Sequence, residues 1–320
     1  MKVVFFGTPD FSIPTLTKLI ESKHEVIAVV TQPDKPVGRN GKVVFSPVKQ
    51  LALQHNIPVL QYEKIRRDGV EELIALNADV FVTAAYGQIL SKEILEASKL
   101  GVFNVHGSLL PKYRGAAPIQ WAVINGETTT GITILKSDVG MDDGDIISLT
   151  PVDVLPNETA GELFDRLADI GADCLLEALA SAENGTITYT PQNHKEATVC
   201  KMLKKEISVI DFSKTNQQVK SLILGLNPWP VAEMNLIEGR FKVYRADVVS
   251  KQKQEQLNLT GVYAPGQILV ANPKQGLIVA CLDGLLEITE IQAENGKVMN
   301  AKSLLNGKKL ELNQIANKLN

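Results

Sequence analysis

The first half of this chain alternates short, mostly apolar runs with stretches that have helical spacing. The runs at residues 2–7, 25–32, 78–85 and 101–106 lack the polar alternation of a half-exposed strand. Strands that are apolar on both faces and separated by helices predict a mostly parallel sheet covered on both sides. We therefore predict a Rossmann-like α/β domain over residues 1–188.

The pattern changes farther along the chain. Residues 130–138 and 144–154 lie on either side of a Gly/Asp-rich turn and predict a hairpin, followed by an amphipathic helix over 159–185. Residues 189–208 are polar without periodicity, which predicts a linker. Short strand patterns separated by glycine turns occupy residues 209–320 and predict a small, OB-like β-barrel.

Composition narrows the classes of protein that remain. Hydrophobic residues make up 44% and charged residues 22% of the 320, as in globular enzymes, and no apolar run approaches the roughly 20 residues of a membrane span. The N-terminal apolar run is too short for a signal peptide. Three isolated cysteines indicate neither a disulfide framework nor a zinc site. We expect a cytoplasmic protein.

The net charge of −3 hides an asymmetry along the chain. Residues 1–188 hold 16 Lys and Arg against 24 Asp and Glu, whereas residues 189–320 hold 17 against 12, an excess of +5. This excess indicates a polyanionic partner for the C-terminal part. A solvated surface can reach the same balance by chance, so both interpretations stay open.

Two nucleotide-binding motifs are missing from the sequence. No G-x-x-x-x-G-K-[ST] occurs, and "FGTPDF" after the first predicted strand offers one glycine in place of G-x-G-x-x-G. An NAD-dependent enzyme is therefore not expected, and "GTPDFS" is predicted to form a tight turn between strand and helix.

Asn104 and His106 end the apolar run at 101–106. Residues two apart on a strand share a face, and ligand sites in open α/β sheets collect at the carboxyl ends of strands. An amide donor beside an imidazole suits a reaction with an oxyanion-bearing tetrahedral intermediate. Asp142, in a turn that Gly140 and Gly144 make compact, is the candidate carboxylate to hold the imidazole. The alternative is that Asn104 and His106 are satisfied buried polar residues.

The turn that holds Asp142 is strongly acidic, which raises the question of a metal site. Its carboxylates are Asp138, Asp142, Asp143 and Asp145. Their spacing does not meet the EF-hand pattern, and we expect no metal.

Several stretches together resemble one family. "NVHGSLLPKYRGAAPIQW" (104–121) and "DVGMDDGD" (138–145) are similar to the folate-dependent formyltransferases. The resemblance extends along the chain through four further motifs: "VVFFGTPDFS" (3–12), "TQPDKPVGR" (31–39), "AAYGQIL" (84–90) and "NPWP" (227–230). The Asn-x-His pair with a downstream Asp is common to the whole family, whereas the continuation "SLLP…RGAAPIQ" and the motif at 31–39 are narrower.

The resemblance implies roles for the matching residues. Asn104, His106 and Asp142 match the family's catalytic trio. The implied formyl donor is 10-formyltetrahydrofolate, used as a co-substrate, and the implied acceptor is the amino group of methionyl-initiator-tRNA. The residues expected at the folate site are Ser108, Leu109, Leu110, Pro111, Tyr86, Gly87, Gln88, Ile89 and Leu90. The residues expected to contact tRNA are Lys35, Arg39, Lys42 and Arg114. A monomer is expected.

Two departures from the family pattern concern the acceptor. Asn40 replaces a glycine and Val43 stands where a second lysine is common, while Trp121 stands where an arginine is frequent. Because the segment ending at Trp121 is also similar to sugar-nucleotide formyltransferases, transfer to a UDP-amino sugar stays as the alternative. The basic C-terminal part and the motif at 31–39 favour tRNA. A hydrolase of 10-formyltetrahydrofolate and a non-enzymatic tRNA- or folate-binding module are further alternatives.

Overall fold

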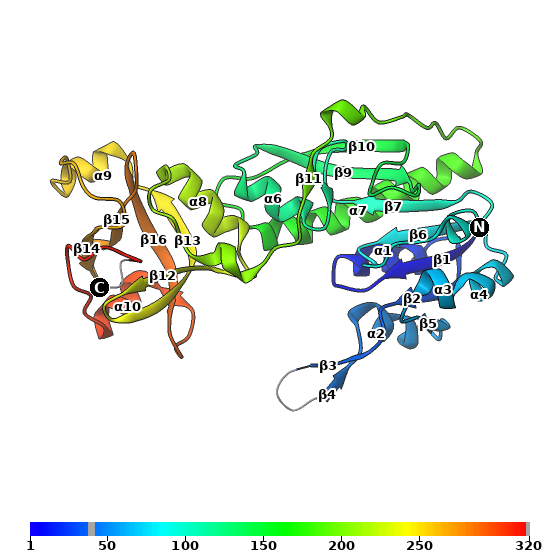
Figure 1. Cartoon of the computed structure of the whole chain (residues 1–320), viewed down its shortest axis with the longest axis horizontal. Helices are drawn as coiled ribbons and strands as arrows, with labels where there is room; N and C mark the ends of the chain where they lie inside the picture. Colours follow the sequence, from blue (N-terminus) through cyan, green and yellow to red (C-terminus); the bar gives the residue numbers. More distant parts are fainter. Residues whose placement is uncertain (38–41, 318–320) are drawn as a thin grey trace. The chain divides into compact units, whose positions relative to one another are not determined.

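The computed structural model describes residues 1–37 and 42–317, with only the backbone described at Val37 and Lys42. The chain divides into two compact units that interleave along the sequence (Figure 1). The first unit comprises Met1–Pro118, Thr129–Asp153 and Phe164–Cys200, and the second comprises Ile119–Thr128, Val154–Leu163 and Lys201–Asn320. The domain limits drawn from the sequence, 1–188 and 209–320, stay predictions.

The first unit is built on a seven-stranded sheet in the order β10-β9-β7-β6-β1-β2-β5 (Figure 1). The strands are β1 Lys2–Gly7, β2 Glu25–Thr31, β5 Val59–Gln61, β6 Val80–Ala84, β7 Val102–His106, β9 Thr129–Lys136 and β10 Ile146–Asp153. The strands from β7 to β5 pair in parallel, so the mostly parallel Rossmann-like sheet is confirmed. The predicted hairpin is the antiparallel β9–β10 pair, which extends the sheet beyond β7.

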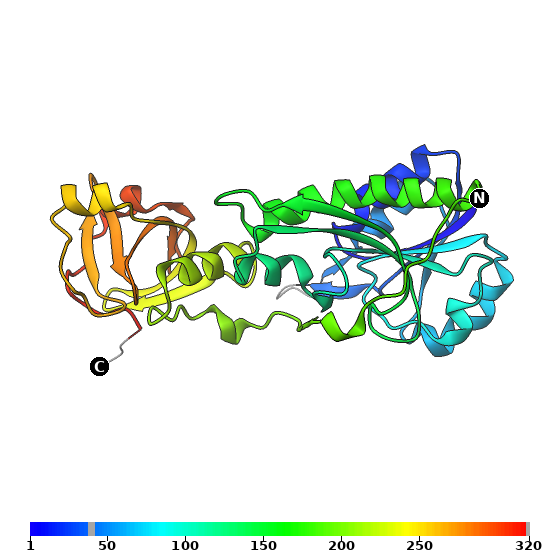
Figure 2. The same ribbon diagram turned by 90° about the horizontal axis from the view of Figure 1, so that it is seen from above.

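Helices cover both faces of this sheet, which explains why β1, β6 and β7 are buried along nearly their whole length. Phe6 packs in a buried cluster with Ile65 and Ile94 from helices on one face. On the opposite face, the ring of Phe11 lies 5.1 Å from that of Phe164 in the long helix α7, which runs beside α1 (Figure 2). The helices are α1 Ser12–Glu21, α2 Pro47–Gln54, α3 Ile65–Asp68, α4 Val70–Ala75, α5 Lys92–Leu95 and α7 Ala160–Glu183.

Two neighbouring parallel strands bring the predicted site loops together. Thr83 of β6 is the register partner of Asn104 of β7, and Ala84 is the partner of Val105. Because the pair is parallel and in register, the loops that follow the two strands leave the sheet at the same edge.

A short hairpin follows β2. Strand β3 (Lys35–Val37) pairs antiparallel with β4 (Lys42–Val44). The side chains of Val43, Val44 and Phe45 are exposed. Residues 38–41 lie outside the described part of the chain, and with them Arg39.

Part of the stretch predicted to be a linker packs onto the first unit. Strand β11 (Val199–Cys200) pairs in parallel with β8 (Arg114–Gly115), in the loop that follows β7. The 3-10 helix η1 (His194–Glu196) precedes β11. The sequence could not predict that this segment packs there, because β11 is held by backbone hydrogen bonds to a loop far away in the chain.

The second unit contains an antiparallel sheet in the order β12-β13-β16-β15-β14, with β17 paired to β16. Its strands are β12 Ala232–Leu236, β13 Gly239–Val248, β14 Ile268–Asn272, β15 Gly276–Ala280, β16 Leu285–Ala293 and β17 Met299–Asn300. The helices that accompany it are α6 Pro118–Ile124, α8 Asn216–Gly225, α9 Lys251–Gln256 and α10 Ala301–Gly307, and the 3-10 helix η2 Lys205–Ser208 precedes α8. A capping box of Thr215 and Gln218 begins α8.

Across residues 1–37 and 42–317, no helix has both the length and the apolar character needed to cross a bilayer.

Candidate active site at the ends of β6 and β7

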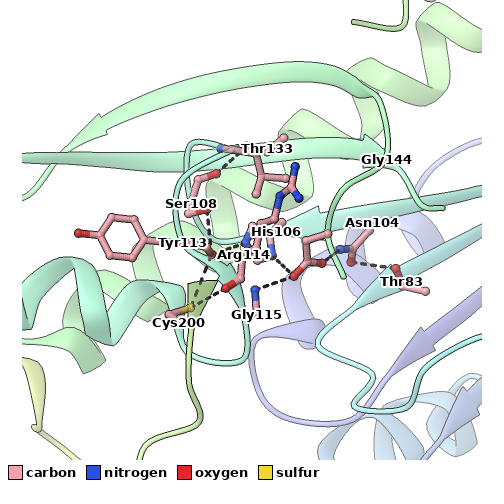
Figure 3. A network of polar contacts seen from close by, with 12 residues as sticks. Thr83, Asn104, His106, Ser108, Tyr113, Arg114, Gly115, Thr133, Gly144 and Cys200 are labelled. Atoms are coloured by element: carbon pink, nitrogen blue, oxygen red, sulfur yellow. Dashed lines mark hydrogen bonds and ion pairs between the residues drawn. The ribbon is translucent and has the colours of Figure 1, made fainter. Parts of the chain in front are cut away.

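Asn104 is oriented by its neighbour in the sheet. The hydroxyl of Thr83 donates a hydrogen bond of 2.8 Å to the amide oxygen Oδ1 of Asn104. The amide nitrogen Nδ2 therefore points the other way, and it lies 3.4 Å from Oδ1 of Asp142 (Figure 3). Since Nδ2 carries two hydrogens, one remains for a ligand at this edge of the sheet.

His106 is only 6% exposed, and a backbone carbonyl determines its tautomer. Its ring nitrogen Nε2 lies 2.9 Å from the carbonyl oxygen of Tyr113, which can only accept a hydrogen bond, so Nε2 carries the hydrogen. In the neutral ring Nδ1 is then the basic atom. Nδ1 lies 3.7 Å from Oδ2 of Asp142, close enough for an ion pair once the ring is protonated.

Asp142 joins the other two residues, in agreement with the predicted grouping. Its Oδ2 accepts a hydrogen bond of 2.8 Å from the backbone N–H of Gly115. Its backbone is in the left-handed region, with φ at +48°. Gly144 allows the close turn that carries it, because a Cβ there would lie 1.9 Å from the carbonyl oxygen of Lys136.

Gly115 is needed in the same loop. It has φ at +108°, and a Cβ there would lie 2.5 Å from the carbonyl oxygen of Cys200. The Cys200 thiol donates to the carbonyl oxygen of Arg114 at 3.1 Å, and burial raises its pKa. Cys200 is therefore a protonated, structural cysteine beside the site.

The loop from Ser108 to Pro111 follows β7 and is held by hydrogen bonds of Ser108. The Ser108 hydroxyl donates to the carbonyl oxygen of Lys112 at 2.7 Å, and its own carbonyl accepts from the Thr133 hydroxyl at 2.6 Å. Leu110 is buried, whereas Leu109 and Pro111 are partly exposed. The loop therefore has a fixed course with two apolar side chains at its surface.

The loop from Tyr86 to Leu90 follows β6. Tyr86 is buried, which raises the pKa of its hydroxyl, and its carbonyl oxygen accepts from Gln32 Nε2 at 3.1 Å. The Gln88 amide is bonded within the unit, to the backbone N–H of Ile65 and the carbonyl oxygen of Tyr62. The exposed members of the loop are Gly87 and Ile89, and Leu90 is partly exposed.

The residues predicted to contact tRNA lie in different environments. Lys35 is exposed on β3, Lys42 begins β4, and Arg39 lies outside the described residues. Arg114 differs from them, being 9% exposed with its guanidinium bonded to the Gln192 side chain. These bonds use Nε and Nη2 of Arg114 inside the first unit, and its predicted contact with tRNA stays a prediction.

Three residues that the sequence analysis did not single out belong to this network. Tyr113 and Gly115 contribute backbone groups, whose partners depend on the path of the chain and leave no mark in the residue type. Gln192 is 6% exposed and contributes its side chain. Gln192 follows Thr190, which forms a β-bridge with Ile146 of β10. Nothing in the sequence distinguishes this buried glutamine from one on the surface.

The acidic turn carries four carboxylates, those of Asp138, Asp142, Asp143 and Asp145. In the described part of the chain, no group of three or more His, Cys, Asp or Glu side chains is arranged to hold a metal ion.

Comparison with known proteins gives the class. The Formyl transferase family matches residues 1–179, and the family described as Formyl transferase, C-terminal domain, matches residues 202–309. Together these matches extend over most of both units. The chain belongs to the formyl transferase family.

Curated relatives narrow the class to methionyl-tRNA formyltransferases. The one from Lachnospira eligens is 47% identical over 313 residues, which is 97% of this chain and 98% of that protein. Those from Clostridioides difficile and Ruminiclostridium cellulolyticum are 44% and 43% identical over 312 residues, again 97% of this chain and 98% of each relative.

Solved structures with a similar fold are more distant in sequence. WlaRD, a sugar 3N-formyl transferase solved in the presence of dTDP and 5-N-formyl-THF, superposes with a TM-score of 0.69 at 19% identity, covering 90% of this chain and 96% of that one. HypX from Aquifex aeolicus, solved in complex with tetrahydrofolic acid, has a TM-score of 0.63 at 16% identity, covering 98% of this chain and 50% of that one. At this identity the likeness concerns the fold.

Proposed function

We propose that this chain transfers the formyl group of 10-formyltetrahydrofolate to the α-amino group of methionyl-initiator-tRNA, which serves the initiation of translation. The observation that carries the proposal is the grouping of Asn104, His106 and Asp142 in a chain that is 43–47% identical to methionyl-tRNA formyltransferases over nearly its full length.

The three residues have complementary tasks in this reaction. The neutral amine of the acceptor attacks the formyl carbon, and negative charge develops on the formyl oxygen. The remaining Nδ2 hydrogen of Asn104 would stabilise that oxygen, a contribution of about 3 kcal/mol for one donor of this type. Nδ1 of His106 would take the proton lost by the amine, and the Asp142 carboxylate 3.7 Å away would stabilise the imidazolium. Collapse of the tetrahedral intermediate would break the bond between the formyl carbon and the folate nitrogen, and the imidazolium would return the proton to that departing nitrogen.

We assign the folate donor to the two loops that follow β6 and β7. The assignment covers Tyr86 to Leu90 and Ser108 to Pro111. It is supported by the register of the two strands, which start both loops at one edge beside Asn104. The apolar side chains of Leu109 and Ile89 suit an aromatic ring system, and the backbone groups of the loops suit its polar edge.

We assign the tRNA to the hairpin of β3 and β4 and to the C-terminal unit. Lys35, Arg39 and Lys42 would meet phosphates of the acceptor end, and the +5 balance of residues 189–320 supports a polyanionic partner. The antiparallel sheet of the second unit would act as an OB-like barrel platform for nucleic acid. Such an enzyme works in the cytoplasm as a monomer.

The acceptor distinguishes this proposal from the sugar-nucleotide alternative. Trp121, which prompted that alternative, donates its indole N–H to the carbonyl oxygen of Lys201 at 2.7 Å, so its side chain has a structural partner. The test is incubation with 10-formyltetrahydrofolate and either methionyl-initiator-tRNA or a UDP-amino sugar. We expect formylated Met-tRNA and no formylated sugar; a formylated sugar alone would overturn the assignment.

A further inference from the structure

Gln192 makes an unusually complete set of hydrogen bonds for a buried side chain. Its amide oxygen accepts from Nε and Nη2 of Arg114, at 3.1 and 2.7 Å. Its amide nitrogen donates to the carbonyl oxygens of Asp142 and Gly144, at 2.8 and 2.7 Å. A primary amide has two hydrogens and two acceptor sites, so every one of them is used.

These bonds hold the turn that carries Asp142. The left-handed backbone of Asp142 is unfavourable for a residue with a side chain, and it persists only where the surroundings fix it. The Gln192 amide bonds the carbonyl of Asp142 itself and the carbonyl two residues later. It therefore fixes the peptide units that follow Asp142 and Gly144.

Arg114, which bonds the Gln192 amide, also lies next in the chain to a residue that holds His106. The residue before it, Tyr113, accepts the hydrogen of His106 Nε2, and the residue after it, Gly115, donates to the Asp142 carboxylate. In the chain, Arg114 thus stands between the Tyr113 carbonyl, which holds His106, and the Gly115 N–H, which holds the Asp142 carboxylate (Figure 3). Its guanidinium also lies 3.1 Å from Nδ1 of His194, whose ring is exposed.

We propose that the side chains of Gln192 and Arg114 form a clasp that positions Asp142 against His106, and that both are positioning residues for formyl transfer. The proposal rests on the proposed function. It requires glutamine in particular: a glutamate would keep the bonds to Arg114 but would turn an acceptor toward the two carbonyls. A methionine of similar length would make none of the four bonds.

The decisive variant is Gln192→Glu, because it keeps the partner of Arg114 and removes only the tie to the Asp142 turn. We expect kcat to fall by about tenfold to a hundredfold, as displacements of about 1 Å near a reacting centre do. KM for both substrates should stay within about twofold, since Gln192 is assigned to neither substrate. The melting temperature should fall by a few degrees, because two buried carbonyl oxygens lose their donor, but the variant should stay folded at the assay temperature.

Gln54→Glu is the matched control, an identical change at an exposed position at the end of α2. It should leave kcat unchanged. If Gln192→Glu fails to fold, Arg114→Lys tests the other half of the clasp, because lysine keeps the charge and loses the fork that binds the amide oxygen, while the bonds from Gln192 to the Asp142 turn can remain.

A spectroscopic measurement separates positioning from simple destabilisation. The chain has four histidines, so the ring ¹⁵N resonances of His106 can be assigned in labelled protein. In Gln192→Met we expect the His106 ring shifts to change while those of His24 and His55 do not. Unchanged His106 shifts together with wild-type kcat in the folded variants would overturn the clasp. Lack of formyl transfer in the wild type would instead overturn the proposed function.

Discussion

The candidate active site at the carboxyl ends of β6 and β7 and the hairpin of β3 and β4 differ in how their side chains are held in place. At the site, each polar side chain has a partner from another segment: Thr83 for Asn104, Tyr113 for His106 and Gly115 for Asp142. On the hairpin, Lys35 is exposed, as are the apolar side chains of Val43, Val44 and Phe45.

The difference indicates a division of work. Groups that must meet a developing charge have to be oriented before the substrate arrives, because reorientation during the reaction would raise its barrier. Groups that meet a large, charged partner can be ordered by that partner. Substitutions at the site should therefore lower kcat, and substitutions on the hairpin should raise KM for tRNA.

The largest effect is expected for Asp142→Asn, although the two side chains have nearly the same shape. Asp142 accepts hydrogen bonds on both oxygens, from Gly115 and from Asn104, whereas asparagine has one acceptor and would face one donor with its own NH₂ group. Loss of the charge also removes the partner of the imidazolium. We expect kcat to fall by about 10³-fold or more, measured in steady-state formylation assays.

The steady-state formylation assay of the wild-type enzyme also tests the expectation that no metal takes part. Treatment of the wild-type enzyme with a chelator should leave its activity unchanged. Inhibition that is reversed by a divalent ion would contradict this account of the acidic turn.

His106→Ala and Asn104→Ala should each lower kcat by about a hundredfold or more, since each removes one group that acts on the transition state. The affinity for the folate donor, measured by titration of the protein, should change little. Activity within threefold of the wild type in either variant would contradict the assigned role.

A smaller effect, on KM for tRNA in place of kcat, is expected for Arg39→Ala. Arg39 lies outside the described part of the chain. Its planar fork can hold a phosphate or a base edge. We expect KM for Met-tRNA to rise by about tenfold, as loss of one good contact of this kind does, with kcat and the folate KM unchanged. Unchanged tRNA kinetics would mean that the segment is only a solvated surface.

The smallest effect is expected for Lys35→Ala. Its ammonium group is exposed on β3 and contributes one screened charge. KM for Met-tRNA should rise by about twofold at low salt, and the difference from the wild type should shrink as the salt concentration increases. A difference that is independent of salt would point to a specific contact in place of a phosphate.

The central part of the site was predictable because strand geometry and glycine content are local properties. Asn104 and His106 share a face because they are two apart on a strand, and Gly144 permits the close turn beside Asp142. The parallel sheet followed from apolar patterning, and the β9–β10 hairpin followed from the Gly/Asp-rich turn between two strand patterns.

The support of the site was not predictable from the sequence. Tyr113 and Gly115 act through backbone groups, and Gln192 comes from a polar stretch that looks like a linker. Arg114 looks like a surface cation beside Lys112, but it is buried, and its Nε and Nη2 donate to a glutamine far along the chain. Such partners are set by the tertiary path of the chain.

The measurement that tests the division of work most directly is a single-turnover formylation assay with both substrates saturating. It compares the wild type, Asp142→Asn and Arg39→Ala. We predict that Arg39→Ala forms formyl-Met-tRNA at the wild-type rate, because saturation compensates for weaker binding, whereas Asp142→Asn stays slower by about 10³-fold. A wild-type rate in Asp142→Asn, or a slow chemical step in Arg39→Ala, would contradict the account.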